Sequence, residues 1–226
     1  MTKNCHEIDI HMSYASKQIT NVHNTKFLEL MIDISLSCKN YSDELISKLN
    51  KACYAVRSVT ALMSPEVLRM IYFSYVHTII SHGIIFWRNS SHSKIIFKIQ
   101  KRIIRVIMNC SSRNSCHDLF KKLNIFLSQS QYLFSLLLFV IKNRDLFRSN
   151  SEVHNVSTRY ISYLHLPIVN LTVFQKGAFY SGIRIFSHLP STIKDLSYDV
   201  KQFELAFKKF LLTNSFYCLE KHFDWK

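Results

Sequence analysis

Only three glycines and three prolines interrupt the 226 residues of this chain. These two residue types make tight turns and end helices, so long runs of isoleucine, leucine and phenylalanine continue without a break. A hydrophobic content of 48% excludes a disordered basic tail and is enough for a real core. The sequence therefore predicts a mainly α-helical fold of one large or two small domains.

The start of the chain has a different pattern. Apolar and polar side chains alternate over residues 8–14, which is typical of a strand. After a short turn, residues 18–22 and 26–34 predict two more strands. We expect a β-hairpin followed by a third strand, an element too small to form a stable sheet by itself.

After residue 36 the apolar residues recur with the period of helices. Ser64 and Pro65 predict a helix start, and Gly83 predicts the end of the same helix. Ser115 and Asp118 offer a capping box for a short helix. The predicted helices cover residues 41–62, 65–81, 93–108, the stretch that ends at Leu123, 129–146 and 199–213.

These patterns suggest four parts. A β element occupies 1–36 and a helical region 37–148. Residues 149–165 are rich in serine, asparagine and histidine and are predicted to be a linker or loop. A small helical unit, punctuated by Gly177 and Gly182, occupies 166–226. Glycines this sparse cannot form a phosphate-binding loop, so we interpret both as packing turns.

The predicted helix at 93–108 is strongly basic on one side. On a helical wheel its basic residues fall within an arc of about 100°; they are Lys94, Lys98, Lys101, Arg102 and Arg105. The opposite side holds Ile95, Ile96, Ile99, Ile103, Val106 and Ile107. A solvated face normally mixes charges of both signs, whereas this one holds no acid. With a net charge of +14, the pattern favours a polyanion such as RNA or DNA over a merely solvated surface.

Other candidate sites are weaker. Cys110, Cys116 and His117 could join Cys218 and His222 around zinc, but their spacing lacks the close pairs of structural zinc sites. Cys116, His117 and Asp118 cannot act as a catalytic triad, because neighbours on a helix point 100° apart. No metal site is therefore predicted. Trp87, Tyr75 and Phe86 could stack on bases, although a core position is favoured in so hydrophobic a stretch.

Several features indicate the compartment. The first residues are polar and unlike a signal peptide, and the six cysteines are scattered, which favours free thiols in a reducing environment. Residues 71–87 and 133–141 are hydrophobic, but both are predicted to be buried helices rather than membrane spans. We expect an intracellular protein, cytoplasmic or nuclear, with no membrane partner.

Six stretches along the chain together resemble a known family. They occur in the order "KFLELMID", "KLNKACYAVRSV", "SHGIIFW", "IQKRIIRVI", "SCHDLFKKLNI" and "NSFYCLEKHF". In this order they resemble the C-terminal part of the reverse transcriptase, an RNA-directed DNA polymerase, of jockey-like LINE-class non-LTR retrotransposons. The resemblance covers about residues 8 to 223 and implies a polymerase thumb, its extension and a primer-grip strand.

The resemblance also assigns roles to particular residues. The primer-grip stretch of the family matches Lys26, Phe27, Leu28, Ile32 and Asp33. Glu29 stands where the family has a glycine, a residue that allows positive φ and close approach of a phosphate. Gln100, Lys101 and Arg105 match a basic motif of the family's thumb. The resemblance therefore implies nucleic-acid contacts at Lys26 as well as at the basic helix, with Phe27, Leu28 and Glu29 at the primer grip.

The catalytic residues of that family are missing from this sequence. Such polymerases hold two metal ions with carboxylates, including an adjacent Asp-Asp pair on a turn between strands. The only adjacent acids here are Asp43 and Glu44, at a predicted helix start. We therefore expect no catalytic residue and no cofactor in this chain, with Mg²⁺ and the palm domain belonging to the full-length enzyme that the resemblance implies.

The sequence thus predicts a binding protein rather than an enzyme. The leading hypothesis is non-specific binding of a template–primer or RNA duplex through its backbone, by a fragment whose natural packing partner is the missing palm domain. One alternative is a non-catalytic interaction protein, or the product of a decayed pseudogene without selected activity. Another is a helix that lies on a membrane surface.

Overall fold

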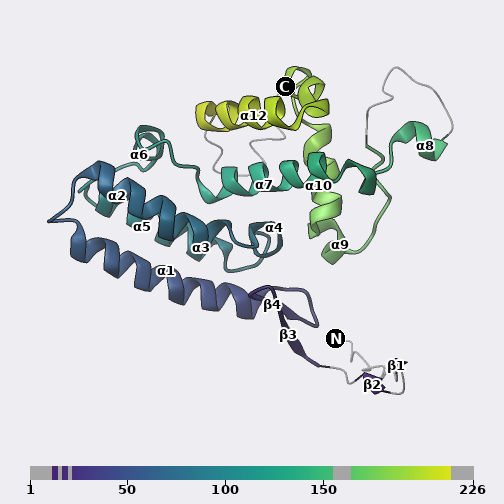
Figure 1. Ribbon diagram of the computed structural model, residues 1–226, viewed down its shortest axis with the longest axis horizontal. Helices are drawn as coiled ribbons and strands as arrows, with labels where there is room; N and C mark the ends of the chain where they lie inside the picture. Colours follow the sequence, from purple (N-terminus) through teal and green to yellow (C-terminus); the bar gives the residue numbers. More distant parts are fainter. Residues whose placement is uncertain (1–11, 15–16, 20–21, 155–163, 215–226) are drawn as a thin grey trace.

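The computed structural model describes residues 12–14, 17–19, 22–154 and 164–214. Helices dominate these residues, and a small β element precedes them (Figure 1). The predicted fold class, mainly α with an N-terminal β-hairpin element, is therefore confirmed. The predicted strand residues 8–11 and most of the family-like stretch at 214–223 lie outside the described residues.

One layer of the molecule consists of α1 (Lys39–Val59), α5 (Ser93–Ile107) and the helical run between them. That run comprises α2 (Pro65–Ile71), the π-helix η1 (Tyr72–Val76), α3 (His77–Ser81) and α4 (Ile84–Trp87). Helices α1 and α5 lie side by side (Figure 1). On α1 the residues Leu45, Leu49, Ala52 and Val56 are buried at helical spacing, and this burial holds the layer together.

The helix predicted at 65–81 is continuous but contains one π turn. Pro65 is its first residue and Ser64 its N-cap, as predicted. Gly83 follows the end of α3 with φ of 59°, a conformation that costs glycine little. The side chain of Leu30 lies where a Cβ of residue 83 would be, so a larger residue here would have to displace Leu30 and adopt a strained φ.

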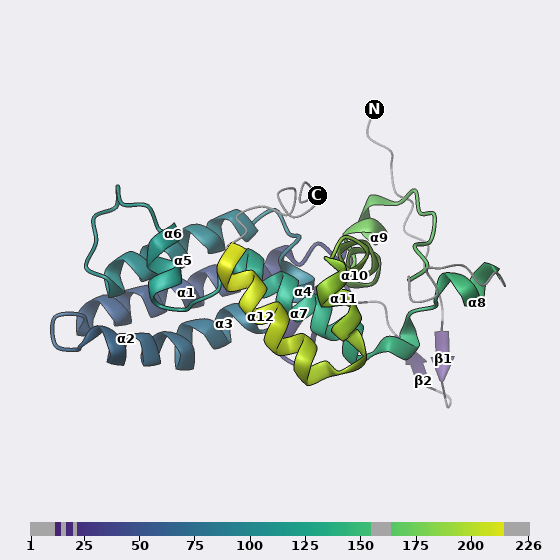
Figure 2. The ribbon, with the colours of Figure 1, turned by 90° about the horizontal axis from the view of Figure 1, so that it is seen from above.

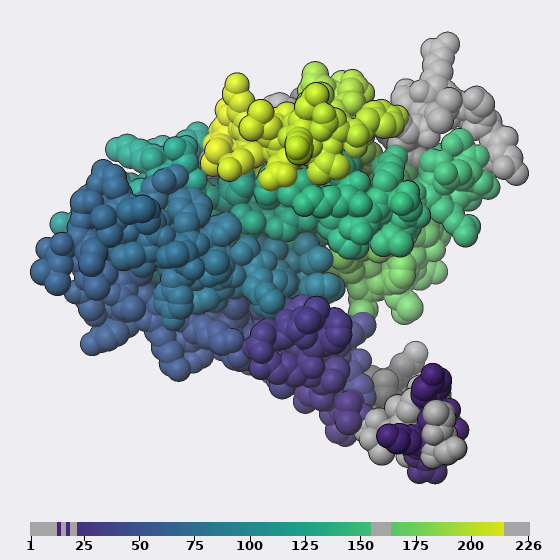
Figure 3. Space-filling view, viewed as in Figure 1, coloured from purple at the N-terminus to yellow at the C-terminus, as the bar shows by residue number. Residues whose placement is uncertain are grey.

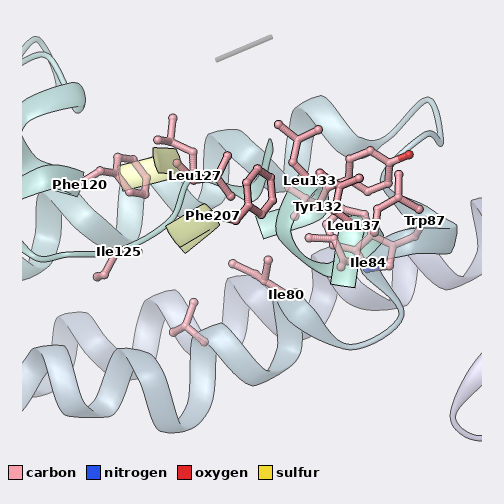
Figure 4. Packing of buried hydrophobic residues seen from close by; sticks show 14 of the residues in the cluster. Ile80, Ile84, Trp87, Phe120, Ile125, Leu127, Tyr132, Leu133, Leu137 and Phe207 are labelled. Atoms are coloured by element: carbon pink, nitrogen blue, oxygen red, sulfur yellow. The ribbon is translucent and has the colours of Figure 1, made fainter. Parts of the chain in front are cut away.

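A second group of helices packs across the first layer (Figures 1 and 2). Its elements are α6 (His117–Lys122), α7 (Ser128–Lys142), the 3-10 helix η2 (Arg144–Leu146), α8 (Asn150–His154), α9 (Thr172–Lys176), α10 (Ala178–Ser187), α11 (Ser191–Lys194), the 3-10 helix η3 (Asp195–Tyr198) and α12 (Val200–Asn214). Helix α7 contacts α3, α4, α10 and α12 and is central to the core. Figure 4 shows Trp87 and Ile84 of α4 close to Tyr132 and Leu137 of α7.

Some local predictions were wrong. The N-cap of α6 is Cys116, while the Ser115 hydroxyl only accepts a bond of 3.4 Å from the His117 N–H. Gly182 lies within α10 rather than at a turn. Its missing side chain leaves room for α7, since a Cβ there would come within 2.7 Å of the Val140 side chain. The linker or loop expected at 149–165 stays a prediction, because residues 155–163 lie outside the described part; the described residues of this stretch contain α8 and an isolated bridge from Ser149 to Leu164.

The β element consists of two antiparallel hairpins. The first pairs β1 (Met12–Tyr14) with β2 (Lys17–Ile19), as the alternating pattern predicts. The second pairs β3 (Asn24–Phe27) with β4 (Leu30–Asp33). The prediction of one strand over 26–34 was therefore wrong, because the chain reverses at Leu28 and Glu29, where φ is 45° and 65°. Figure 3 shows the second hairpin at the end of the helical body.

Contacts with the helices hold the second hairpin in place. Strand β4 packs on α1, and Leu30 fills the space beside Gly83. The ring Nε2 of His82 lies 3.2 Å from the carbonyl oxygen of Leu28. These tertiary contacts offset the cost of two non-glycine residues with positive φ.

Candidate nucleic-acid interface

Helix α5 presents its basic residues to solvent, as its sequence pattern predicts. Lys94, Lys98 and Arg102 are exposed, while Lys101 and Arg105 are partly buried. The predicted apolar side is buried at Ile96, Ile99, Ile103 and Ile107.

The edge of that apolar side was predicted wrongly. Ile95 is 43% exposed and Val106 is only partly buried, whereas Gln100 and Ile104 are fully enclosed. The buried arc is shifted because α5 packs against α1 and α2 and also meets the segment that begins α7. A helical wheel cannot locate those neighbours.

Two of the basic side chains on α5 are held in position by contacts within the protein. The Lys101 ammonium lies 4.6 Å from the centre of the Phe97 ring, a cation–π contact. The Arg105 Nε and Nη2 donate to the carbonyl oxygen of Asn114 over 3.2 and 3.1 Å. Both charges are therefore oriented before any ligand arrives, and Arg105 also fixes the loop that follows α5.

Packing of α1 against α5 adds a cation that the sequence pattern missed. Arg57, near the end of α1, lines a hollow of about 410 Å³ together with α5 side chains and Ser112. The α5 side chains that line it are Lys98, Lys101, Arg102 and Arg105. Within the described part of the chain, no acidic residue lines this hollow. Arg57 lies far from α5 in sequence, so only a predicted α1–α5 contact could have indicated its role.

The acids of the described residues form their ion pairs elsewhere. Glu44 pairs with Lys48 over 2.7 Å on the surface of α1. Asp43 lies 2.8 Å from His92 and connects the beginnings of α1 and α5. The positive charges on α5 are thus not balanced by a salt bridge in the described residues.

The predicted primer-grip residues form the exposed tip of the second hairpin. Phe27 and Leu28 are 60% and 74% exposed, and Lys26 pairs with Glu29 over 2.9 Å. The hydrogen bond between them raises the pKa of Lys26 and lowers the pKa of Glu29. Glu29 has a positive φ of 65° and also offsets the charge of Lys26.

The structure does not bring this tip together with the hollow. The hairpin packs near the start of α1, whereas Arg57 lies in its last turn, about 27 Å further along the axis at 1.5 Å per residue. Lys26 and the α5 cations therefore belong to two separate parts of the surface. Only Lys94, at the start of α5, lies on the hairpin side of the molecule.

The remaining candidates have structural positions. Cys116 is buried, and burial raises the pKa of its thiol. Among the described residues no three or more His, Cys, Asp or Glu side chains gather where they could hold a metal ion; Cys218 and His222 lie outside them. Trp87 is fully buried, as favoured, and its Nε1 donates to the His82 carbonyl, whereas Tyr75 and Phe86 are 46% and 53% exposed.

A second group of lysines was also missed in the sequence. Lys121 of α6 and Lys208 and Lys209 of α12 line a hollow of about 660 Å³. Two helices far apart in sequence contribute to it, so no local pattern could indicate it.

Comparisons with known proteins found no relative of this chain. No family model, curated protein or solved structure matches this chain. In the described part of the chain, no helix has the length and apolar character needed to cross a membrane.

Proposed function

We propose that this chain binds RNA or DNA through the phosphate backbone, without reading sequence. The observation that carries the proposal is the surface formed by α5 and Arg57, which we call the basic face. It comprises Arg57, Lys94, Lys98, Lys101, Arg102 and Arg105, and no ion pair in the described residues balances it. Phosphate contacts of this kind supply affinity that is independent of sequence.

The spacing of the cations suits a polyanion. Lys94, Lys98 and Arg102 follow each other at steps of four residues, which is about 6 Å along a helix. From Lys94 to Arg105 the row extends for about 16 Å. One strand of B-form DNA carries a phosphate about every 3.4 Å along the axis, so the row spans roughly five phosphates of one strand.

We further propose that the chain is a non-catalytic relic of a reverse transcriptase. The ordered family-like stretches support this descent, and a helical layer preceded by a hairpin is compatible with a thumb beside a primer grip. The adjacent aspartates that hold catalytic metal ions are missing from the sequence. The proposed activity is therefore binding of nucleic acid without polymerisation.

Salt dependence of binding tests the proposal. Each phosphate contact contributes about −0.9 to the slope of log K against log salt concentration for duplex DNA. The variant K94Q/K98Q/R102Q removes three exposed charges, and glutamine keeps a similar helix propensity. We expect the magnitude of the slope to fall by about two to three units, equally for unrelated sequences.

A variant with the same net charge provides the control. K39Q/K51Q/K142Q removes three exposed lysines away from the basic face and should leave the slope near the wild-type value. If both variants reduce the slope equally, overall charge rather than the basic face determines binding. If neither does, and circular dichroism shows both to be folded, the proposal is wrong.

A further inference from the structure

Two hollows meet beside the end of α1. The first is the cationic hollow of about 410 Å³ already described. The second has a volume of about 500 Å³ and lies between the end of α1, the start of α2 and the end of α5. Arg57 and Arg105 line both hollows, so the two are adjacent, and we refer to the pair as the depression.

The first hollow has more positive charge than one phosphodiester can balance. Five cations line it, and three of them are arginines. The planar guanidinium groups of Arg57 and Arg102 can bind phosphate oxygens in pairs, whereas one edge of Arg105 already donates to Asn114. A phosphodiester carries a single negative charge, whereas a terminal polyphosphate carries several on adjacent groups. The Ser112 hydroxyl adds a neutral donor on the same wall. This lining can therefore also hold a terminal polyphosphate, which places several negative charges close together.

The second hollow has a mixed lining, in which apolar side chains lie beside Arg57 and Arg105. Ala61, Met63, Pro65 and Leu68 line it, and Thr60 and Asn109 add polar groups at its wall. Small-molecule sites usually combine an apolar lining with a few polar groups at volumes of about 300–1,000 Å³. Met63 is 41% exposed, and its flexible thioether side chain can adapt to a flat ring. This half of the depression suits a nucleobase.

We propose that this depression binds a nucleoside 5′-polyphosphate, with the phosphates among Arg57 and the α5 cations and the base beside Met63. The inference rests on the proposed function, because the same helix would hold the backbone of a bound strand. The nucleotide is either free or the 5′ end of an RNA, since both present the same group. Arg57 is the residue that distinguishes this site from the rest of the basic face.

Binding of a short RNA with a 5′-triphosphate or a 5′-hydroxyl end tests the proposal by fluorescence anisotropy. We expect the triphosphate end to bind roughly ten- to a hundredfold more tightly, the range of one charged hydrogen bond. R57Q should remove this preference, so that the ratio of the two affinities falls to about one. R57K should keep part of the preference, and the matched α1 variant K51Q should keep all of it. Equal affinity for the two ends overturns the inference, while a shallower salt slope in K94Q/K98Q/R102Q still supports the proposed function.

Competition identifies the source and the role of the second hollow. A free nucleoside triphosphate should displace the triphosphate RNA at a lower concentration than inorganic tripolyphosphate does. A61F should remove this difference between the two competitors by filling the second hollow. Displacement of the RNA by the free nucleotide identifies the free nucleotide as a ligand of the site. If even a large excess of the nucleotide does not displace the RNA, while the preference for the triphosphate end persists, the site recognises strand ends. Equal displacement by tripolyphosphate and the nucleotide overturns the placement of the base.

Discussion

Gln100 connects three parts of the core, and its replacement by leucine should destabilise the fold. Its side-chain Nε2 donates to the Tyr72 hydroxyl and to the Phe126 carbonyl, each over 2.9 Å. Its Oε1 accepts from the backbone N–H of Ser128, the first residue of α7, over 2.9 Å. Gln100 is 1% exposed, so water cannot easily replace these bonds. One side chain thus joins α5 to η1 and to the start of α7.

The size of the effect follows from the groups left without a partner. In Q100L the Tyr72 hydroxyl and the Ser128 N–H are buried, and each costs about 1–3 kcal/mol. The Phe126 carbonyl is only partly buried and can reach water. Burial of the leucine side chain returns about 1–2 kcal/mol. We expect a net loss of about 2–4 kcal/mol in the free energy of unfolding, and a Tm lower by about 5–15 °C for a chain of this size.

Urea unfolding followed by circular dichroism measures the loss. The control Q202L makes the same change on the exposed side of α12 and should alter stability by less than about 0.5 kcal/mol. In a double-mutant cycle with Y72F, the coupling energy should be about 1–2 kcal/mol. Y72F removes the Tyr72 hydroxyl, one of the two groups that lose their hydrogen-bond partner in Q100L. A loss below about 0.5 kcal/mol for Q100L, or no coupling with Y72F, would refute the reasoning.

Two further predictions concern the second hairpin and the segment after it. The variant L28N/E29G places residues that tolerate positive φ at the turn. It should stabilise the hairpin by about 1 kcal/mol and slow amide exchange in β3 and β4. Faster exchange would show that the lost Lys26–Glu29 ion pair contributes more to stability than the backbone conformation of the turn. Burial acts to raise the pKa of Asp33, but hydrogen bonds from Ser37 and Ser35 outweigh it and the pKa is lowered. Stability from these bonds is present at neutral pH and is lost as the pH falls through the folded-state pKa; a carboxyl NMR titration should give a midpoint below 3.8, and a midpoint at or above 3.8 would contradict the assignment.

The helices of the first layer could be predicted because their signals are local. The burial of Leu45, Leu49 and Val56 follows from a 3.6-residue period, and the start of α2 from Ser64 and Pro65. The basic side of α5 follows in the same way from five residues on one arc. Each of these features depends only on residues within a few helical turns of one another.

Features that depend on distant segments could not be predicted. The reversal at Leu28 and Glu29 lacks the usual Asn-Gly signal, and contacts of Leu30 and Leu28 with the Gly83 corner stabilise it instead. Gln100 lies among basic residues in sequence and resembles part of a binding motif, but the packing of α5 makes it a buried structural residue. Its three hydrogen bonds need Tyr72 and Ser128, which only the tertiary fold brings near.

The candidate site likewise has features that depend on local sequence and features that depend on distant segments. The unbalanced basic side of one helix follows from the sequence, because charge and helical period are both local properties. Three features depend on the packing of distant segments: Arg57 joins this side, Lys26 lies beside Glu29 at the other end of α1, and a second hollow with apolar residues adjoins the cations. A concave site needs side chains from several segments, and the packing of α1 against α5 sets their positions.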